Sequence, residues 1–131
     1  MPHDILIIDD EWAIALALGA RLKDHGFSVR TARDGHAGLA AAKQCPPDAI
    51  LLDLRMPDID GFEVQRRLNA DINLANIPVI FLSANVLDSA RQQAQGAGAA
   101  GFFAKPYQSD EIVAALTVAI TAAARPAANA A

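Results

Sequence analysis

Cysteine is nearly absent from this sequence, in which Cys45 is the single example. One thiol can form neither an internal disulfide nor a cysteine cluster around a metal ion, and a reducing compartment tolerates such a composition. We interpret Cys45 as a small hydrophobic residue at the end of a helix. The first residues also lack the pattern of a signal or transit peptide, so we expect a cytoplasmic location.

Long apolar runs and an excess of basic residues are lacking as well. Hydrophobic residues make up 53% of the sequence and charged residues 20%, which favours a folded domain over disorder. No apolar run approaches the roughly 20 residues that span a bilayer. The net charge is −4, so we expect no direct binding to nucleic acid and none to an anionic membrane. A chain of 131 residues is expected to form one core.

Five short apolar runs alternate with five longer segments of helical character. This alternation predicts an α/β fold built from repeated strand–helix units around a parallel sheet. Three runs are apolar throughout, as central strands covered on both faces should be. The five runs are Ile5–Ile8, Phe27–Val29, Ala49–Leu52, Val79–Leu82 and Phe102–Ala104.

Between the runs, apolar residues recur at helical spacing and predict helix faces that pack on the core. The first helix is predicted to bury Ile14, Leu18 and Leu22. The last is predicted to bury Ile112, Ala115, Leu116, Ala119 and Ile120. Gly26 is expected to end the first helix. We expect a domain over residues 1–121, and a flexible tail or the start of a linker over the alanine-rich residues 122–131.

Acidic residues follow two of the predicted central strands. Asp9, Asp10 and Glu11 come after the first run, and Asp53 comes after the third. Ligands of open parallel sheets bind beyond the carboxyl ends of the strands, where these carboxylates would converge if the two strands are neighbours. Such crowding favours a hard divalent cation, and Mg²⁺ prefers oxygen ligands. Glu11 alone is explained equally well as an acid at a helix N-terminus.

A hydroxyl and an ammonium follow two further predicted strands, the fourth and the fifth. Ser83 follows the fourth run, and Lys105 follows the fifth. Taken singly, Ser83 would be a helix cap and Lys105 a solvated lysine. Together with the carboxylate of Asp53 and a divalent cation, they form the set that phosphoryl transfer to an aspartate requires.

The ordered set of motifs resembles the bacterial receiver domains of two-component response regulators, from Ile5 to about Thr121. The resemblance implies a flavodoxin-like (βα)5 three-layer sandwich with strand order 2-1-3-4-5. The motifs are Asp9 with Asp10, Asp53, Met56 with Pro57, Gly61, Ser83, and Lys105 with Pro106.

The resemblance also implies a role for each site residue. Asp53 would accept a phosphoryl group from a histidine kinase or a histidine phosphotransfer protein. Asp10, Asp53 and the backbone carbonyl of Arg55 would hold Mg²⁺, with Asp9 acting through water. Ser83 and Lys105 would contact the phosphoryl oxygens. Such a domain catalyses its own phosphorylation and dephosphorylation and is not a metabolic enzyme.

Ser83 and Phe102 occupy the positions of the family's switch residues. Phe102 would couple the site to a surface formed by the fourth helix, the fifth strand and the fifth helix, which a downstream effector, a linked output domain or a second copy of the chain would bind. Three residues depart from the family pattern. Phe102 stands where tyrosine is common in the family, and Ser83 stands where threonine is frequent. Arg55 places a large cation near the route of the attacking water. The lifetime of the phosphorylated state is therefore expected to differ from that of other members, in a direction that the sequence does not fix.

Several other interpretations compete with this one. A haloacid-dehalogenase-type phosphatase also phosphorylates an aspartate beside Mg²⁺, but it carries a second acid where this sequence has Arg55. A flavodoxin-like cofactor module would bring phosphate against Asp9 and Asp10. A pseudo-receiver scaffold would lack the phosphorylation. Gly96–Gly101 matches GxGxxG, but it is expected to end a helix rather than open one. His3, His25 and His36 lack metal-ligand spacing and are expected at the surface.

Overall fold

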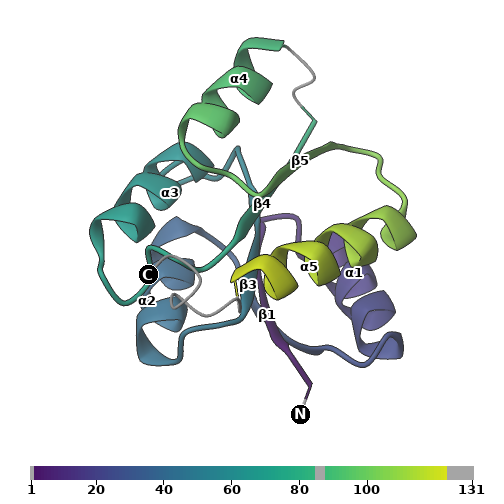
Figure 1. Ribbon diagram of the computed structural model, residues 1–131. Helices are drawn as coiled ribbons and strands as arrows, with labels where there is room; N and C mark the ends of the chain where they lie inside the picture. The colour runs from purple at the N-terminus through teal and green to yellow at the C-terminus, as the bar shows by residue number, and fades with distance from the viewer. Residues whose placement is uncertain (1, 85–87, 124–131) are drawn as a thin grey trace.

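A single five-stranded parallel sheet forms the centre of the computed structural model, which describes residues 2–84 and 88–123 (Figure 1). The strands lie in the order β2-β1-β3-β4-β5, and every neighbouring pair is parallel, as predicted. They are β1 (Asp4–Ile8), β2 (Ser28–Ala32), β3 (Ala49–Asp53), β4 (Val79–Ser83) and β5 (Gly101–Ala104).

In the part of the chain that the structure describes, five helices cover the two faces of the sheet and complete a three-layer sandwich. In Figure 1, α1 and α5 lie on one side of the strands, and α2, α3 and α4 lie on the other. The helices are α1 (Trp12–Asp24), α2 (Gly35–Gln44), α3 (Gly61–Ala70), α4 (Asp88–Gly96) and α5 (Ser109–Ala123). Within residues 2–84 and 88–123, no helix has the length and apolar character needed to cross a membrane.

The continuously apolar strands are the central ones, as the sequence predicted. All five residues of β3 and of β4 are buried, whereas the edge strand β2 buries only Ala32. Alternate side chains of β1 enter different cores: Leu6 and Ile8 pack on the side of α2 to α4, and Ile5 and Ile7 pack on the side of α1 and α5. Burial of each such side chain stabilises the fold by about 1.5–3 kcal/mol.

The end of β3 and the start of α3 lie very close together, and Gly61 permits this. A Cβ on Gly61 would lie 2.6 Å from the carbonyl oxygen of Asp53 and 3.0 Å from the Cα of Leu54. The N–H of Gly61 donates to the carbonyl of Leu54 at 2.9 Å. The side chain of Asp60 caps α3 by accepting a hydrogen bond from the N–H of Glu63 at 2.8 Å. These contacts fix the chain that follows Asp53.

Some predicted details differ in the structure. Ile14 is 36% exposed and not in the core, because four-residue steps drift by about 40° around a helix and place it at the edge of the buried face. Cys45 caps the end of α2, as its predicted position required, but its side chain is exposed. Phe27 precedes β2 instead of starting it.

Several glycines lie at the ends of helices and strands, as predicted. Gly26 follows α1 with a φ of +90°, the left-handed conformation that favours glycine at a helix end. Gly96 ends α4 and Gly101 begins β5, so the GxGxxG match is a turn from a helix into a strand. Helix α5 continues through Ala123, and the remainder of the predicted tail, residues 124–131, lies outside the described residues.

Candidate phosphoacceptor and metal site

Three carboxylates meet at the carboxyl edge of the sheet. Asp9 and Asp10 follow β1, and Asp53 is the last residue of β3, which pairs directly with β1. Each offers an oxygen, and these oxygens lie within 4.8 Å of one another. Asp9 and Asp53 are only 2% and 5% exposed, whereas Asp10 is open to solvent. We call Asp9, Asp10 and Asp53 the acidic cluster.

The ammonium of Lys105 lies against this acidic cluster. Its Nζ is 3.1 Å from Oδ2 of Asp9 and 3.7 Å from Oδ1 of Asp53. The side chain is 11% exposed. Lys105 follows β5 directly, and its backbone N–H donates to the carbonyl of Ser83, the buried last residue of β4, at 2.8 Å. The structure therefore brings the five predicted residues to one edge of the sheet.

The combined effect of burial and the neighbouring charges raises the pKa values of both Asp53 and Lys105, which favours the neutral form of the acid and the charged form of the lysine. Burial, reinforced by the charge of Asp9, raises the pKa of Asp53 to about 7 against the attraction of Lys105. Burial opposes the charged form of Lys105, but Asp53, Asp9 and Glu11 together raise its pKa to about 12. The lysine stays protonated, while the carboxylate charge of the acidic cluster is incompletely balanced by the protein.

The donor set of the acidic cluster fits a hard divalent cation. Carboxylate oxygens are the ligands that Mg²⁺ prefers, and one or two carboxylates suffice because the ion retains several waters. The exposure of Asp10 leaves one side of the cluster accessible to such waters. A divalent cation would also favour the ionised form of Asp53, whose pKa is otherwise raised.

The loop between β3 and α3 is held at two points. The N–H of Arg55 donates to Oδ1 of Asp53 at 3.5 Å. Farther along, the carboxylate of Asp58 accepts hydrogen bonds from the N–H groups of Gly35 and His36 at 3.0 and 2.8 Å, and it contacts Nδ1 of His36 at 2.6 Å. Burial would raise the pKa of Asp58, but these hydrogen bonds hold it well below its usual range. Asp58 thereby ties the loop to the start of α2.

The aromatic ring of Phe102 lies on β5 under a side chain of α4. The guanidinium carbon of Arg91 is 4.9 Å from the centroid of the ring, a distance that suits a cation–π contact. Phe102 is half-buried and packs against the core on the side of α2 to α4. The predicted switch position is thus in contact with both the core and the surface of α4.

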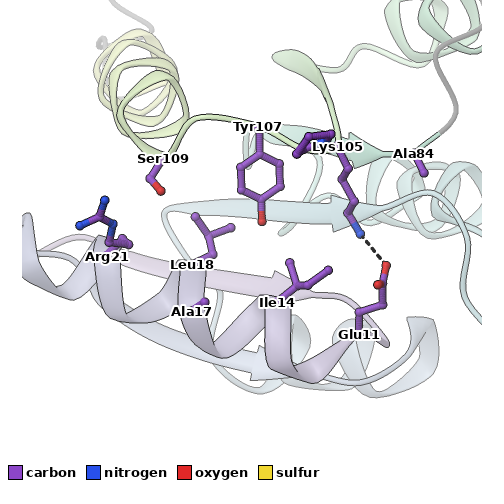
Figure 2. Close-up of a pocket in the computed structure, with 10 residues that line it drawn as sticks. Glu11, Ile14, Ala17, Leu18, Arg21, Ala84, Lys105, Tyr107 and Ser109 are labelled. Carbon is purple, nitrogen blue, oxygen red and sulfur yellow. Dashed lines mark hydrogen bonds and ion pairs between the residues drawn. The ribbon is translucent and has the colours of Figure 1, made fainter.

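Sequence reasoning missed the contact of Glu11. Glu11 is the N-cap residue of α1, yet its side chain makes no capping hydrogen bond. Its Oε1 lies 3.1 Å from Nζ of Lys105. Figure 2 marks this contact with a dashed line. The contact lies beside a cavity of about 620 Å³ between α1 and the segment after β5, whose lining includes Ile14, Leu18 and Tyr107. No spacing in the sequence predicted this pair, because it depends on two side-chain conformations.

The histidines are at the surface, as expected. The side chains of His3, His25 and His36 are 54%, 42% and 60% exposed. Each lies near an aspartate, but none belongs to the acidic cluster.

Comparison with known proteins identifies the family. The family model of the response regulator receiver domain matches residues 5–117, which include the whole acidic cluster, Ser83 and Lys105. The chain belongs to this receiver-domain family. It is therefore the receiver domain of a two-component response regulator, a signalling domain, and the phosphatase and cofactor-module interpretations are not favoured.

Two curated relatives illustrate the sequence similarity of this receiver domain. The DNA-binding dual master transcriptional regulator RpaA of Synechocystis sp. is 42% identical over 116 residues, which cover 87% of this chain and 47% of that protein. The transcriptional regulatory protein KdpE of Mycobacterium tuberculosis is 42% identical over 116 residues, covering 88% of this chain and 50% of that protein. The chain thus spans about half the length of these relatives.

Solved structures show the same fold for this receiver domain. The chemotaxis response regulator CheY4 of Vibrio cholerae superposes with a TM-score of 0.84 at 27% identity, covering 91% of this chain and 99% of that one. The receiver domain of a signal transduction histidine kinase from Syntrophus aciditrophicus gives a TM-score of 0.86 at 26% identity, covering 95% and 94%. These neighbours confirm the CheY-like, flavodoxin-like architecture.

Proposed function

We propose that this receiver domain accepts a phosphoryl group on Asp53 from a phosphohistidine of a histidine kinase or a histidine phosphotransfer protein. The observation that carries the proposal is the meeting of three carboxylates with the ammonium of Lys105 at one edge of the sheet. A buried carboxylate beside a fixed cation offers both a nucleophile and a partner for the incoming negative charge.

In the proposed reaction, Asp53 is the nucleophile that receives the phosphoryl group from the phosphohistidine. A carboxylate oxygen of Asp53 attacks the phosphorus, a P–O bond forms, and the P–N bond to the donor imidazole breaks. The imidazole nitrogen leaves with the electron pair and takes up a proton. Lys105 pairs with a phosphoryl oxygen, and the hydroxyl of Ser83 donates to another.

We assign the Mg²⁺ ligands to Asp10, Asp53 and the backbone carbonyl of Arg55, with Asp9 acting through water. When bound, the ion supplies positive charge that keeps Asp53 ionised and screens the phosphoryl oxygens. The raised pKa of Asp53 supports the assignment of a cation, because without added positive charge the nucleophilic carboxylate is partly protonated near neutral pH. The activity ends with the domain's own phosphorylation and dephosphorylation, so no metabolic substrate is involved.

We assign the output to the surface formed by α4, β5 and α5. Phe102 supports this assignment, since its ring joins the core to Arg91 on α4. Movement of Ser83 toward the phosphoryl group would alter the packing beside this ring and change the surface that an effector, a linked output domain or a second copy binds. Light scattering with and without beryllofluoride, a mimic of the acyl phosphate, measures whether activation makes a homodimer.

The decisive experiment is intact mass spectrometry after incubation with acetyl phosphate and Mg²⁺. We expect a gain of one phosphoryl group that hydroxylamine removes, as for an acyl phosphate. The gain should disappear in Asp53→Asn and persist in Asp24→Asn, a matched change at an exposed acid that ends α1. A wild-type chain that gains no mass would indicate a pseudo-receiver, and a gain retained in Asp53→Asn would place the phosphoryl group elsewhere.

A second measurement uses Trp12, the exposed first residue of α1, which follows the acidic pair by two residues. We expect its fluorescence to change on addition of Mg²⁺ and again on addition of beryllofluoride. Absence of any change with either, in a protein that binds neither by calorimetry, would refute the metal assignment.

A further inference from the structure

Lys105 has one partner that the proposed phosphotransfer does not use. The ammonium lies 3.1 Å from Oδ2 of Asp9 and 3.1 Å from Oε1 of Glu11, while Oδ1 of Asp53 lies farther away at 3.7 Å. An ammonium offers three N–H donors. In the resting state two of them therefore donate to carboxylates other than that of the phosphoacceptor.

We propose that Glu11 is a latch on Lys105, holding its ammonium in the resting state and releasing it when Asp53 carries a phosphoryl group. The latch rests on the proposed function, because it needs a phosphoryl oxygen as the competing partner. Glu11 acts through Lys105 and is a positioning residue that favours the unphosphorylated state.

Asp9 and Glu11 differ in burial, and this difference decides which of the two carboxylates loses its contact with Lys105. Asp9 is 2% exposed, and its Oδ1 also accepts a hydrogen bond from the N–H of Glu11 at 2.9 Å. Loss of Lys105 would deprive this buried carboxylate of the cation in direct contact with it, which is costly. The side chain of Glu11 is 54% exposed, so water can hydrate its carboxylate in place of Lys105 at little cost in free energy. The incoming phosphoryl group therefore displaces Glu11.

The place of the contact gives the latch a structural consequence. Figure 2 shows Glu11 at the start of α1 reaching toward Lys105, which comes from the end of β5. The pair joins two elements on either side of the cavity beside α1, and both residues line it. Release of Glu11 removes this link, so phosphorylation changes one wall of the cavity as well as the α4 side of the domain.

Three variants distinguish the direct contact between Glu11 and Lys105 from a long-range effect of the negative charge of Glu11. Glu11→Gln removes the charge with the shape kept. Glu11→Asp keeps the charge but shortens the side chain by one methylene, which withdraws the carboxylate from Lys105. Glu111→Gln is the matched control, because it removes a charge from an exposed site in the first turn of α5. For each variant, calorimetry first measures the Mg²⁺ dissociation constant and then, at saturating Mg²⁺, the dissociation constant for beryllofluoride.

We expect both Glu11 variants to bind beryllofluoride about two- to fivefold more tightly than wild type, the range that an exposed ion pair supplies, with Glu111→Gln unchanged. Weaker binding by Glu11→Gln would mean that Glu11 orients Lys105 for activation, and it would overturn the latch. Tighter binding by Glu11→Gln but not by Glu11→Asp would reduce the effect to long-range charge and would also overturn it. If the wild-type chain bound no beryllofluoride at saturating Mg²⁺, that result would instead contradict the proposed function of Asp53 as the phosphoacceptor.

Discussion

Asp53 should destabilise the metal-free domain at neutral and higher pH. Its pKa is raised from 3.8 to about 7 in the folded state by burial and by Asp9, so folding at pH 8 forces a charge into an unfavourable site. We predict that Asp53→Asn, which mimics the neutral acid, is more stable than wild type at pH 8 when EDTA removes divalent ions.

The magnitude follows from the pKa difference. The difference between a pKa of 3.8 and one of about 7 corresponds to about 4 kcal/mol at most. The site opens to solvent at Asp10, and screening there reduces the expected gain to about 2 kcal/mol. Since a raised carboxyl pKa favours the folded state only while the acid is protonated, the stability of wild type falls as pH rises from about 4 to about 7. The advantage of Asp53→Asn should therefore grow from pH 5 to pH 8.

Urea denaturation followed by circular dichroism at both pH values measures this difference. Asp24→Asn is the control, and we expect it to change the free energy of unfolding by less than about 0.5 kcal/mol at either pH. Added Mg²⁺ should stabilise wild type by about 3 kcal/mol at one hundred times its dissociation constant, and Asp53→Asn by much less. A variant no more stable than wild type at pH 8, or an advantage of equal size at pH 5, would refute this reasoning.

Three further substitutions test the supports of the site. Asp58→Asn should cost about 1 kcal/mol at pH 7 in urea denaturation, and the cost should shrink as pH falls below about 4, because a lowered carboxyl pKa stabilises the fold only when the acid is ionised. Gly61→Ala should cost about 1–3 kcal/mol in thermal melts and weaken Mg²⁺ binding by calorimetry, because its Cβ would meet the backbone of Asp53. Leu51→Ala, fully buried in β3, should cost about 2–5 kcal/mol in urea denaturation.

The fold was predictable because its central strands are buried on both faces. The runs at Ile5–Ile8, Ala49–Leu52 and Val79–Leu82 are apolar without interruption, and that pattern distinguishes covered parallel strands from half-exposed ones. The edge strand β2 was placed less well, because Arg30 and Thr31 lie on a partly exposed edge and break the apolar pattern. The strand order came from the family resemblance and not from periodicity.

The acidic cluster was also predictable, because strand ends in a parallel sheet meet at one edge whatever the side-chain conformations. Contacts made by side chains outside the strands were not. Glu11 looked like an ordinary helix-terminal acid, and only its conformation brings it to Lys105. Asp58 lay unremarked in a loop, and its bonds to the start of α2 join segments more than 20 residues apart. Sequence patterns fix backbone neighbours more surely than the partners of flexible polar groups.

The charges at this edge of the sheet are the physical basis of the switch proposed for Lys105. The acidic cluster and Glu11 contribute four carboxylates, and Lys105 contributes one ammonium that already contacts three of them. An acyl phosphate in place of the carboxylate of Asp53 carries up to about two negative charges instead of one. The ammonium then has a stronger partner within reach, and the carboxylate most easily hydrated loses it. In the proposed switch, phosphorylation of Asp53 would change the partners of Lys105, and it would thereby act on the start of α1 and on the end of β5.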